Sequence, residues 1–549
     1  MRPLDPLRNM ADAADIAKAG TFGALRSGLA RPLNPIVATR MLTAFRKWGT
    51  TPALGFALGA VRDGEATAIV DVDDPQQEEI SFDDAEYRTT VLTNSLIDRG
   101  AQPGKTVGIL GRNSRAYAES IVAVARTGAD LVYLNTGSTA EQVNAVCAAY
   151  GITIMIHDRE FAGICPDSVL SLGLDDPAGI PLLDCMPWSG DVSAPRTPSK
   201  HVILTSGTTS GTPKGAARTT APLDSVAALL HAFPTRKGSV TLLAAPMFHS
   251  WGWMHHRMAI VMDNTQILLR HPDPERILAL AQAYEVETII TVPVILKRMV
   301  DLPADTKRAY DFSSVRCVAV SGSAIPGDLA HRFMHDFGDV LYSLYGTTEA
   351  AYATIATPED LRDDPQTAGR PMPGVRVEVF DRKGRTVPRG TDGRIYVRSR
   401  TSIAEYAADG SSGTVKGMVP TGDIGCLDQQ GRLTIKGRAD DMVVTGGENV
   451  HPAEVEEVLR RHPGLADVAV TGRPDPVYGS VLIAHAVVVD DDLTDEELLS
   501  WARGQLGPHH RPREVRRVDA LPLNATGKVL RRVLAGEVTI EELDEEELM

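Results

Sequence analysis

The sequence predicts an α/β protein with a large N-terminal body, built of parallel-sheet α/β subdomains and a small β-barrel, and a smaller α+β C-terminal domain. Three observations predict this class. Apolar runs alternate with helical segments up to about residue 321, short strands separated by turns follow from about Gln366, and helical and strand-like segments mix after Asp441. The 549 residues suffice for several domains of roughly 150 residues each.

The alternation in the first part indicates βαβ units. Thr106–Leu110 and Asp130–Leu134 have the apolar pattern of strands, and Ser114–Thr127 between them has helical spacing. Strands that alternate with helices in this way are typical of a parallel sheet. The alternation continues through the apolar runs Val240–Ala245, Glu287–Val292 and Cys317–Ser321.

After Gln366 the spacing changes, because Gly, Pro and Asp turns separate short strand candidates. These candidates are Val375–Phe380, Gly393–Arg398 and Arg432–Lys436. Hairpins or a small barrel fit such spacing better than crossovers do. Beyond Asp441 the pattern predicts helices at Glu454–Arg461 and Asp495–Leu506, and strands at Val468–Val470 and Val481–Val489.

Composition excludes several classes of protein. Hydrophobic residues make up 43% and charged residues 23%, as in a globular protein, and the net charge of −15 disfavours a nucleic-acid partner. The 5 cysteines are scattered without CxxC spacing, which argues against a disulfide framework and a zinc ribbon. No apolar run is long enough to span a membrane and no signal peptide is evident, so we expect a cytoplasmic protein.

The N-terminal arm, residues 1–49, differs from the rest in charge. Its first 47 residues carry eight Lys or Arg and three Asp, whereas the last 13 residues of the chain carry seven acids and no base. A basic, partly amphipathic arm can contact an anionic membrane. The alternative, which the wide spacing of the basic residues favours, is a helix that lies on its own acidic domain.

A loop rich in Gly and hydroxyl residues, Thr205–Gly215, follows the strand candidate His201–Leu204. Closely spaced glycines let backbone N–H groups converge on phosphate oxygens, and Lys214 adds a positive charge. The spacing of Gly207 and Gly211 differs from that of a Walker A loop. The segment therefore predicts a phosphate loop of another kind.

This segment resembles the phosphate loop of the adenylate-forming superfamily, which includes acyl-CoA synthetases, firefly luciferases and the adenylation domains of peptide synthetases. Further motifs that resemble those of the superfamily follow in the same order. They are Tyr345–Glu349, Thr421–Asp423, Gly437–Asp441, Gly446–Val450 and Asn524–Lys528. The resemblance is closest to fatty-acid–CoA ligases. It implies an AMP-binding domain over residues 50–440 and a mobile C-terminal domain over residues 441–549.

The resemblance also implies roles for individual residues. The nucleotide would be bound by Thr205, Ser206, Gly207, Thr208, Thr209, Gly211, Lys214, Ser323, Tyr345, Gly346, Thr347, Asp423 and Arg438. Thr205 and Glu349 would hold Mg²⁺, and Lys528, Glu349 and Thr348 would be catalytic. The chemistry suits these roles, since a carboxylate such as Asp423 can accept bonds from ribose hydroxyls and a lysine can stabilise charge at phosphorus.

Two further features follow from the same resemblance. Asp440 would be the hinge of the C-terminal domain, and Gly446 and Gly447 would form the face along which the pantetheine arm of CoA approaches. An ordinary turn is the alternative interpretation of the two glycines.

The segment Pro246–Met254 resembles the part of the family that lines the acyl pocket, and its key residues are His249 and Trp253, with Gly322 beside them. His249 stands where members that activate amino acids have Asp, so an α-amino acid is a poor candidate. Two Trp and two Met suit an apolar chain. Core packing is the alternative interpretation of this cluster.

The predicted function is ATP-dependent activation of a medium- to long-chain fatty acid to an acyl-adenylate and then, with CoA, to acyl-CoA, with release of pyrophosphate and AMP. The expected cofactor is Mg²⁺ with ATP, and CoA is the co-substrate. Three alternatives stay open: an acyl-AMP ligase that loads a carrier protein, a luciferase-like oxygenase and a non-catalytic nucleotide-binding relative. The presence of Lys528, Glu349, Asp423 and Arg438 together argues against the last.

Overall fold

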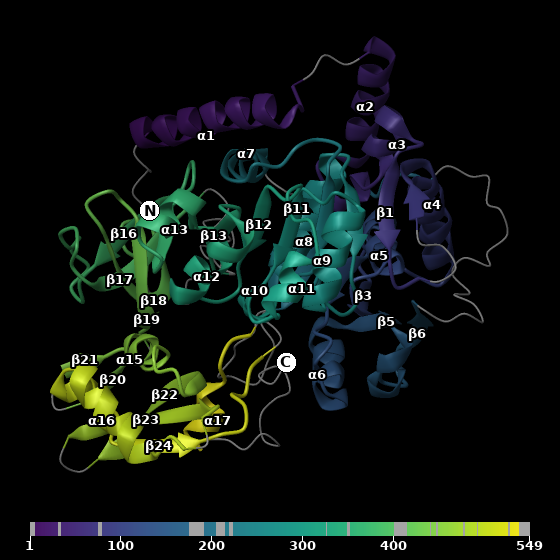
Figure 1. Cartoon of the computed structure of the whole chain (residues 1–549). Coiled ribbons are helices and arrows are strands. Elements are labelled where there is room, and N and C mark those ends of the chain that lie inside the picture. Colours follow the sequence, from purple (N-terminus) through teal and green to yellow (C-terminus); the bar gives the residue numbers. More distant parts are fainter. Residues whose placement is uncertain are drawn as a thin grey trace. The chain divides into compact units, whose positions relative to one another are not determined.

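Figure 1 shows the computed structural model of the chain, which forms two compact units. Unit 1 comprises residues 1–321 and 336–342, and unit 2 comprises residues 322–335 and 343–549. The structure describes residues 6–30, 34–74, 79–174, 192–204, 215–218, 223–325, 327–347, 352–399, 414–439, 441–445, 448–475, 478–490, 492–524 and 527–536.

One sheet of unit 1 has six strands in the order β6-β5-β3-β4-β7-β8. Their bounds are β3 Thr106–Leu110, β4 Asp130–Tyr133, β5 Ile152–His157, β6 Leu170–Gly173, β7 His201–Leu204 and β8 Gly215–Arg218. All neighbouring pairs are parallel except β7–β8. The connecting elements are α5 (Arg115–Thr127), α6 (Ala140–Tyr150) and η2 (Arg159–Ile164). The predicted strand–helix–strand unit at residues 106–134 is confirmed.

Local signals set the ends of α5. The Ser114 hydroxyl accepts from the backbone N–H of Tyr117, and Gly128 ends the helix in the left-handed conformation. All but one residue of α5 are buried, because α4 (Phe82–Asp98) and η1 (Pro52–Leu54) pack against it.

A second group of strands in unit 1 pairs in the order β2-β1-β10-β9-β11-β12. The strands are β1 Thr67–Asp71, β2 Glu79–Ser81, β9 Val240–Leu243, β10 Thr265–Leu268, β11 Thr288–Thr291 and β12 Cys317–Val320. Every pair is parallel except β1–β2. The accompanying helices are α8 (Ser250–Val261), α9 (Pro274–Ala283), α10 (Pro293–Val300) and α11 (Ala304–Arg308). The parallel strands are almost entirely buried, as expected of strands covered on both faces.

The N-terminal arm folds into α1 (Pro6–Ser27) and α2 (Pro35–Trp48), which precede α3 (Ala57–Asp63). Helix α1 packs closely on α7 (Leu223–Ala232), because a Cβ at Gly20 would lie 3.0 Å from that of Ala227. The Arg26 guanidinium donates to the carbonyl oxygens of Leu230 at 2.8 Å and His231 at 3.0 Å, near the C-terminal end of α7. Helix α1 therefore lies on its own domain, and contact of the arm with a membrane stays a prediction.

Unit 2 contains an antiparallel series in the order β14-β15-β19-β18-β17-β16. The bounds are β14 Thr354–Ala356, β15 Thr367–Pro371, β16 Arg376–Phe380, β17 Gly393–Arg398, β18 Val419–Leu427 and β19 Leu433–Arg438. Strand β13 (Leu341–Tyr345) pairs with β14, and the helices are α12 (Gly327–Phe337) and α13 (Pro358–Asp363). The hairpins expected after Gln366 are present.

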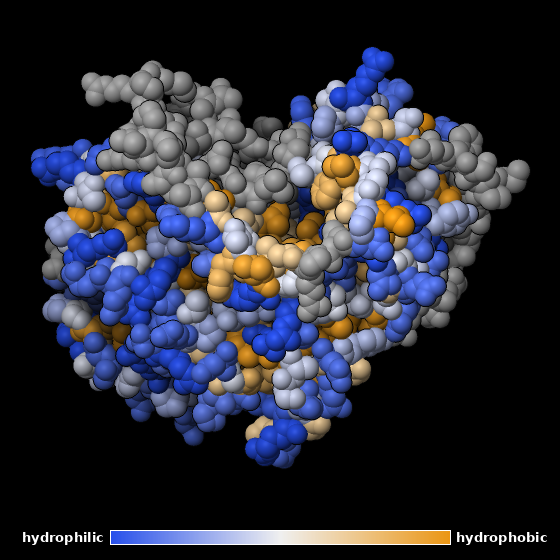
Figure 2. Space-filling model, turned by 90° about the horizontal axis from the view of Figure 1, so that it is seen from above, coloured by the Kyte–Doolittle hydropathy of each residue, from blue (hydrophilic) through white to orange (hydrophobic). Residues whose placement is uncertain are grey.

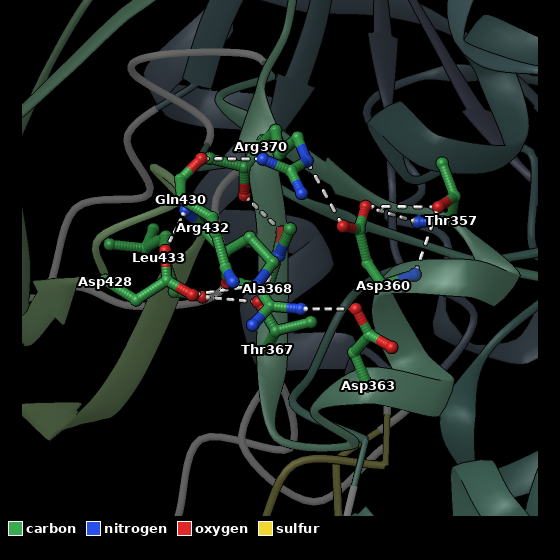
Figure 3. A network of polar contacts seen from close by, with 12 residues as sticks. Thr357, Asp360, Asp363, Thr367, Ala368, Arg370, Asp428, Gln430, Arg432 and Leu433 are labelled. Carbon is green, nitrogen blue, oxygen red and sulfur yellow. Dashed lines mark hydrogen bonds and ion pairs between the residues drawn. The ribbon is translucent and has the colours of Figure 1, made fainter.

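A polar network ties β15 to α13 and to the β18–β19 turn (Figure 3). Arg370 donates to Asp360 at 3.2 Å and to the carbonyl oxygen of Gln430 at 2.6 Å. Arg432 pairs with Asp428 at 2.7 Å and with Asp363 at 3.3 Å. The network joins segments more than sixty residues apart and so fixes the hairpin that carries β18 and β19.

The C-terminal part of unit 2 has a core of its own. Its elements are β20 Val443–Thr445, β21 Glu448–Val450, α15 Pro452–Leu459, β22 Leu465–Asp475, β23 Gly479–Val488, α16 Asp495–Gln505, η3 Pro508–His510, β24 Glu514–Arg517 and α17 Arg531–Leu534. Val455, Leu459, Val468 and Leu482 are among the buried residues that pack together there. The predicted class, a large sheet body and a smaller C-terminal domain, is confirmed, while the boundaries at residues 49 and 440 stay predictions.

None of the helices in the described residues is both long and apolar enough to traverse a bilayer.

Gly252 in α8 tests how tightly this helix packs on the loop that precedes it. A Cβ at Gly252 would lie 2.2 Å from the carbonyl oxygen of Pro246, and backbone cannot move aside cheaply. We expect Gly252→Ala to cost about 1–3 kcal/mol of stability and to lower the melting temperature. Gly504→Ala in α16 is the matched control, since a Cβ there meets nothing within 4 Å and Ala favours a helix. An equal or higher melting temperature for Gly252→Ala would contradict the close packing.

Candidate functional site

Asp423 is a buried carboxylate in unit 2 that three of the predicted motifs surround. It lies on β18 and is 8% exposed, and its Oδ2 accepts a 2.5 Å hydrogen bond from the Tyr345 hydroxyl. The guanidinium of Arg438 lies 3.5 Å from its Oδ1. The structure thus brings together three residues from separate sequence motifs.

Strand register explains why Asp423 and Arg438 meet. They are direct partners across the antiparallel β18–β19 pair, so their side chains lie side by side on one face. Gly422, with φ +80°, adopts a left-handed conformation within β18 just before Asp423, and a Cβ there would lie 2.9 Å from a terminal nitrogen of Arg438. The glycine therefore supplies both the backbone conformation and the space for the guanidinium.

The environment of Asp423 pulls its pKa in two directions. Burial raises the pKa above the usual value for Asp, and the Tyr345 hydroxyl, Arg438 and the charge of Lys528 act against that rise. Burial and the neighbouring Asp423 raise the pKa of Tyr345, so its hydroxyl stays protonated and acts as a hydrogen-bond donor to Asp423. A desolvated carboxylate among donors is suited to accept hydrogen bonds from a ligand's hydroxyl groups.

Lys528 lies in a tight turn. Asn524 donates its backbone N–H to the carbonyl oxygen of Lys528 at 2.9 Å, and the Asn524 side chain accepts from the Lys528 N–H at 2.9 Å. Leu523 and Val529 pair on either side of this turn, and the Lys528 side chain is exposed. The ammonium is therefore presented to solvent on a short, braced hairpin.

Arg531 anchors this hairpin to the C-terminal core. Its guanidinium bonds both carboxylate oxygens of Glu456 on α15, one of them at 3.1 Å, and donates to the carbonyl oxygen of Val470 at 2.9 Å. Burial opposes ionisation of Glu456, but Arg531, Arg460 and the N–H of Val470 hold the pKa of its carboxyl below the usual value. Since Arg531 follows Lys528 by three residues, this pair holds the C-terminal end of the Lys528 hairpin against α15 and β22.

Two of the predicted acyl-pocket residues, His249 and Trp253, lie at the start of α8 in unit 1. His249 precedes the helix, its ring lies 4.4 Å from that of Phe248, and burial lowers its pKa to about 4, so it is neutral at pH 7. Trp253 is 6% exposed and its indole N–H donates to the Tyr133 hydroxyl at 2.8 Å. The indole is therefore held in one orientation.

Asn113 holds the loop that leads into α8. Its side-chain amide donates to the carbonyl oxygens of Leu243 at 3.1 Å and Ala245 at 2.9 Å, and its oxygen accepts from the N–H of Met247 at 2.8 Å. Sequence reasoning missed Asn113, Glu456 and Arg531, because all three act through partners far away in the chain. The one local signal was a charged residue, Glu456, on the apolar face of a predicted helix.

The structure covers only part of the predicted set. Gly322 and Ser323 follow β12, Gly322 has φ +106°, and Gly346 and Thr347 follow β13. The other predicted residues lie outside the described residues: Thr205, Ser206, Gly207, Thr208, Thr209, Gly211, Lys214, Thr348, Glu349, Asp440, Gly446 and Gly447. Within the described ranges, no three His, Cys, Asp or Glu side chains are grouped to hold a metal ion.

Two family models match the chain. A family model described as AMP-binding enzyme matches residues 56–407, and one described as AMP-binding enzyme C-terminal domain matches residues 454–528. The chain belongs to the AMP-binding enzyme family. It is therefore an enzyme of the AMP-forming ligase superfamily, as the motifs predict.

The relatives are named for different substrates and reactions. A fatty acid–[acyl-carrier-protein] ligase, ScoC, from Streptomyces coeruleorubidus is 29% identical over 83% of this chain and 91% of its own. A feruloyl-CoA synthase from an Amycolatopsis species is 30% identical over 82% of this chain and 92% of its own. The solved structure of the amide bond synthetase McbA from Marinactinospora thermotolerans superposes with a TM-score of 0.76 at 27% identity, covering 88% of this chain and 99% of that one.

Replacing Arg531 tests whether the Arg531–Glu456 pair holds the C-terminal domain of this AMP-binding enzyme together. Arg531→Met leaves Glu456 buried without its main partner, which we expect to cost about 3 kcal/mol. Because the folded-state pKa of Glu456 is depressed, its contribution is present above the ordinary Glu pKa of 4.5 and is lost as the pH falls through the folded pKa. The difference in melting temperature between variant and wild type should therefore shrink in acid.

The matched control is Arg517→Met, which removes an exposed ion pair with Asp495 in the same domain. Its cost should stay below about 1 kcal/mol at any pH. Equal losses for the two variants would contradict the anchoring role of Arg531.

Proposed function

We propose that this enzyme activates a fatty acid of medium or long chain with ATP, forms an acyl-adenylate and pyrophosphate, and transfers the acyl group to the thiol of CoA with release of AMP. The observation that carries the proposal is the environment of Asp423, which Tyr345, Arg438 and Lys528 share. Those four residues belong to four separate sequence motifs.

The chemistry of this group suits adenylation. The Asp423 carboxylate can accept bonds from both ribose hydroxyls, and Arg438 can donate to the ribose or to phosphate. In adenylation a carboxylate oxygen of the acid attacks the α-phosphorus while pyrophosphate leaves, so negative charge accumulates around phosphorus. Lys528, an exposed cation on a braced hairpin, is suited to stabilise that charge.

The proposal also includes the residues predicted to hold magnesium and the phosphates. ATP is used as its magnesium complex, for which Thr205 and Glu349 are the proposed protein contacts, with Thr348 beside Glu349. The loop at residues 205–214 would hold the phosphates. Mg²⁺ favours few carboxylates together with phosphate oxygens and water, which agrees with a single Glu at the site.

The two-step chemistry requires a second arrangement of the C-terminal domain, so we propose Asp440 as the hinge between residues 50–440 and 441–549. The Gly446–Gly447 pair would then face the pantetheine arm of CoA, where the absence of side chains allows close approach.

The fatty-acid assignment rests on the apolar character of α8 and on the name of one relative. Trp251 and Trp253 are buried on this helix, and the neutral His249 offers no charge for an ammonium group. ScoC is named for ligation of a fatty acid to a carrier protein, whereas the Amycolatopsis relative is named for a CoA thioester. A carrier protein is therefore the second candidate acceptor, favoured by the ScoC likeness.

We also propose that the N-terminal arm contacts an anionic membrane. Phe22 on α1 is 53% exposed, Leu25 on α1 67% and Ile36 on α2 64%. Arg26 is the basic residue in the last turn of α1, and α2 carries Arg40, Arg46 and Lys47. The side of Figure 1 that carries α1 and α2 is seen in Figure 2, where apolar patches lie among hydrophilic ones. Exposed apolar side chains beside basic ones are the combination that binds a membrane interface.

The adenylation step is tested by acid-dependent exchange of pyrophosphate into ATP. We expect Lys528→Ala to lower the exchange rate about 100- to 1000-fold, because one charge-stabilising group is lost, while ATP binding persists. Lys383→Ala, which removes an exposed lysine in another turn of unit 2, is the matched control. Near-normal exchange by Lys528→Ala would contradict its role.

The two candidate acceptors are distinguished by a separate assay. The release of AMP is measured with CoA and, in a parallel reaction, with a carrier protein.

Membrane contact is tested by flotation with vesicles of anionic or zwitterionic lipid. We expect the wild type to float with anionic vesicles and the double variant Phe22→Ser, Leu25→Ser to lose most of that binding. The control replaces two exposed apolar residues of α4, Tyr87 and Ile97, with Ser. Equal flotation by both double variants, or none by the wild type, would reject the proposal.

A further inference from the structure

A chain of buried hydrogen bonds in unit 1 links α8 to the six-stranded sheet. The indole N–H of Trp253 donates to the Tyr133 hydroxyl at 2.8 Å, and that hydroxyl lies 2.6 Å from Nδ1 of His201. Tyr133 is 1% and His201 0% exposed. Tyr133 stands on β4 and His201 on β7, so the three side chains come from three separate elements.

This chain fixes where the protons lie. Burial raises the pKa of Tyr133, so its hydroxyl stays protonated, and burial with nearby Arg257 lowers the pKa of His201 to about 3, so its ring is neutral. Since the Tyr133 oxygen already accepts from Trp253, we assign its own hydrogen to the bond with His201 Nδ1. The single proton of the neutral ring is then on Nε2. That Nε2 is buried and has no hydrogen-bond partner.

Arg257 adds a cation next to the same indole. Its guanidinium carbon lies 4.8 Å from the centroid of the Trp253 ring, and one terminal nitrogen, Nη2, donates to the carbonyl oxygen of Thr50 at 3.2 Å. The other, Nη1, is buried and has no partner. Burial lowers the pKa of Arg257 to about 10, so it is still charged at pH 7, and its contacts among the described residues include no ion pair to a carboxylate.

Arg126 offers a comparison within the chain. It lies at the same 4.8 Å over the ring of Trp48, but it pairs with Glu86 at 2.7 Å and donates to the carbonyl oxygen of Ala53 at 2.9 Å. A buried guanidinium without such a partner is costly, as is a buried N–H without an acceptor. A bound anion can remove both costs.

We propose that Arg257 and His201 form a subsite for a second carboxylate, carried by the acyl substrate away from its reacting carboxyl group. The inference rests on the proposed function and deepens it, since Trp253, to which both residues are adjacent, belongs to the proposed acyl pocket. The substrate class is then an α,ω-dicarboxylic acid. Arginine suits this task, because its planar set of donors matches a carboxylate.

The test compares a series of α,ω-dicarboxylic acids with the monocarboxylic acids of the same chain lengths, in acid-dependent exchange of pyrophosphate into ATP. For the wild type we expect a higher kcat/KM for the dicarboxylic acid at one or more lengths. In Arg257→Met the ratio of the two kcat/KM values should fall at least about 30-fold, because a buried charge pair is lost. Tyr133→Phe, which releases the His201 proton from Nε2, should shift the ratio in the same direction.

Heat stability gives a readout that does not depend on turnover. A dicarboxylic acid should raise the melting temperature of the wild type more than its monocarboxylic counterpart does, and this difference should vanish in Arg257→Met. Without ligand, Arg257→Met should melt no lower than the wild type, whereas the matched control Arg126→Met should melt lower because it leaves Glu86 unpaired.

The outcomes separate the two proposals. Three results would each overturn the carboxylate subsite while leaving the proposed function in place. The first is exchange with monocarboxylic acids alone, and the second is a ratio of the two kcat/KM values that changes less than threefold in Arg257→Met. The third is an equal fall in melting temperature for Arg257→Met and Arg126→Met. Absence of exchange with every acid of either series would overturn the proposed function itself.

Discussion

The arrangement of unit 2 depends on the need to surround one desolvated carboxylate, Asp423, with groups that favour its charge. The Tyr345 hydroxyl and the Arg438 guanidinium contact it, and the charge of Lys528 reaches it. Several local features serve this end, among them the β18–β19 register, the left-handed conformation of Gly422 and the polar network that fixes the β18–β19 turn to β15. The same carboxylate, once surrounded by donors, is suited to bind sugar hydroxyls.

Elsewhere in the chain, buried charges differ in whether they have partners, and this difference separates structural from ligand-binding groups. Glu456 has Arg531, Arg460 and a backbone N–H, and Arg126 has Glu86, so these charges stabilise the fold where they lie. Arg257 and His201 keep buried N–H groups without acceptors. Their position beside Trp253, next to the cation of Arg257, agrees with the proposed carboxylate subsite.

Elements with strong local signals could be predicted from the sequence, and long-range contacts could not. Strand Thr106–Leu110 agrees residue for residue, and Ser114 and Gly128 define the helix between β3 and β4. Strand β22 is longer than the predicted Val468–Val470, because it is an edge strand that pairs with β23 along its whole length and tolerates Pro474 there. The contact of Tyr345 with Asp423 spans 78 residues, and no local pattern encodes it. The motifs predicted both residues as ligands of the nucleotide but not the bond between them.

The proposed function depends on one step, the coupling of a carboxylic acid to AMP. Mass spectrometry of a single turnover, with wild-type enzyme, magnesium–ATP and acid but no CoA, detects the product of this step. We expect an acyl-adenylate and pyrophosphate in equal amounts, and loss of the adenylate with appearance of AMP when CoA is added. Formation of ADP and phosphate, or acid-independent cleavage of ATP without an adenylate, would contradict it.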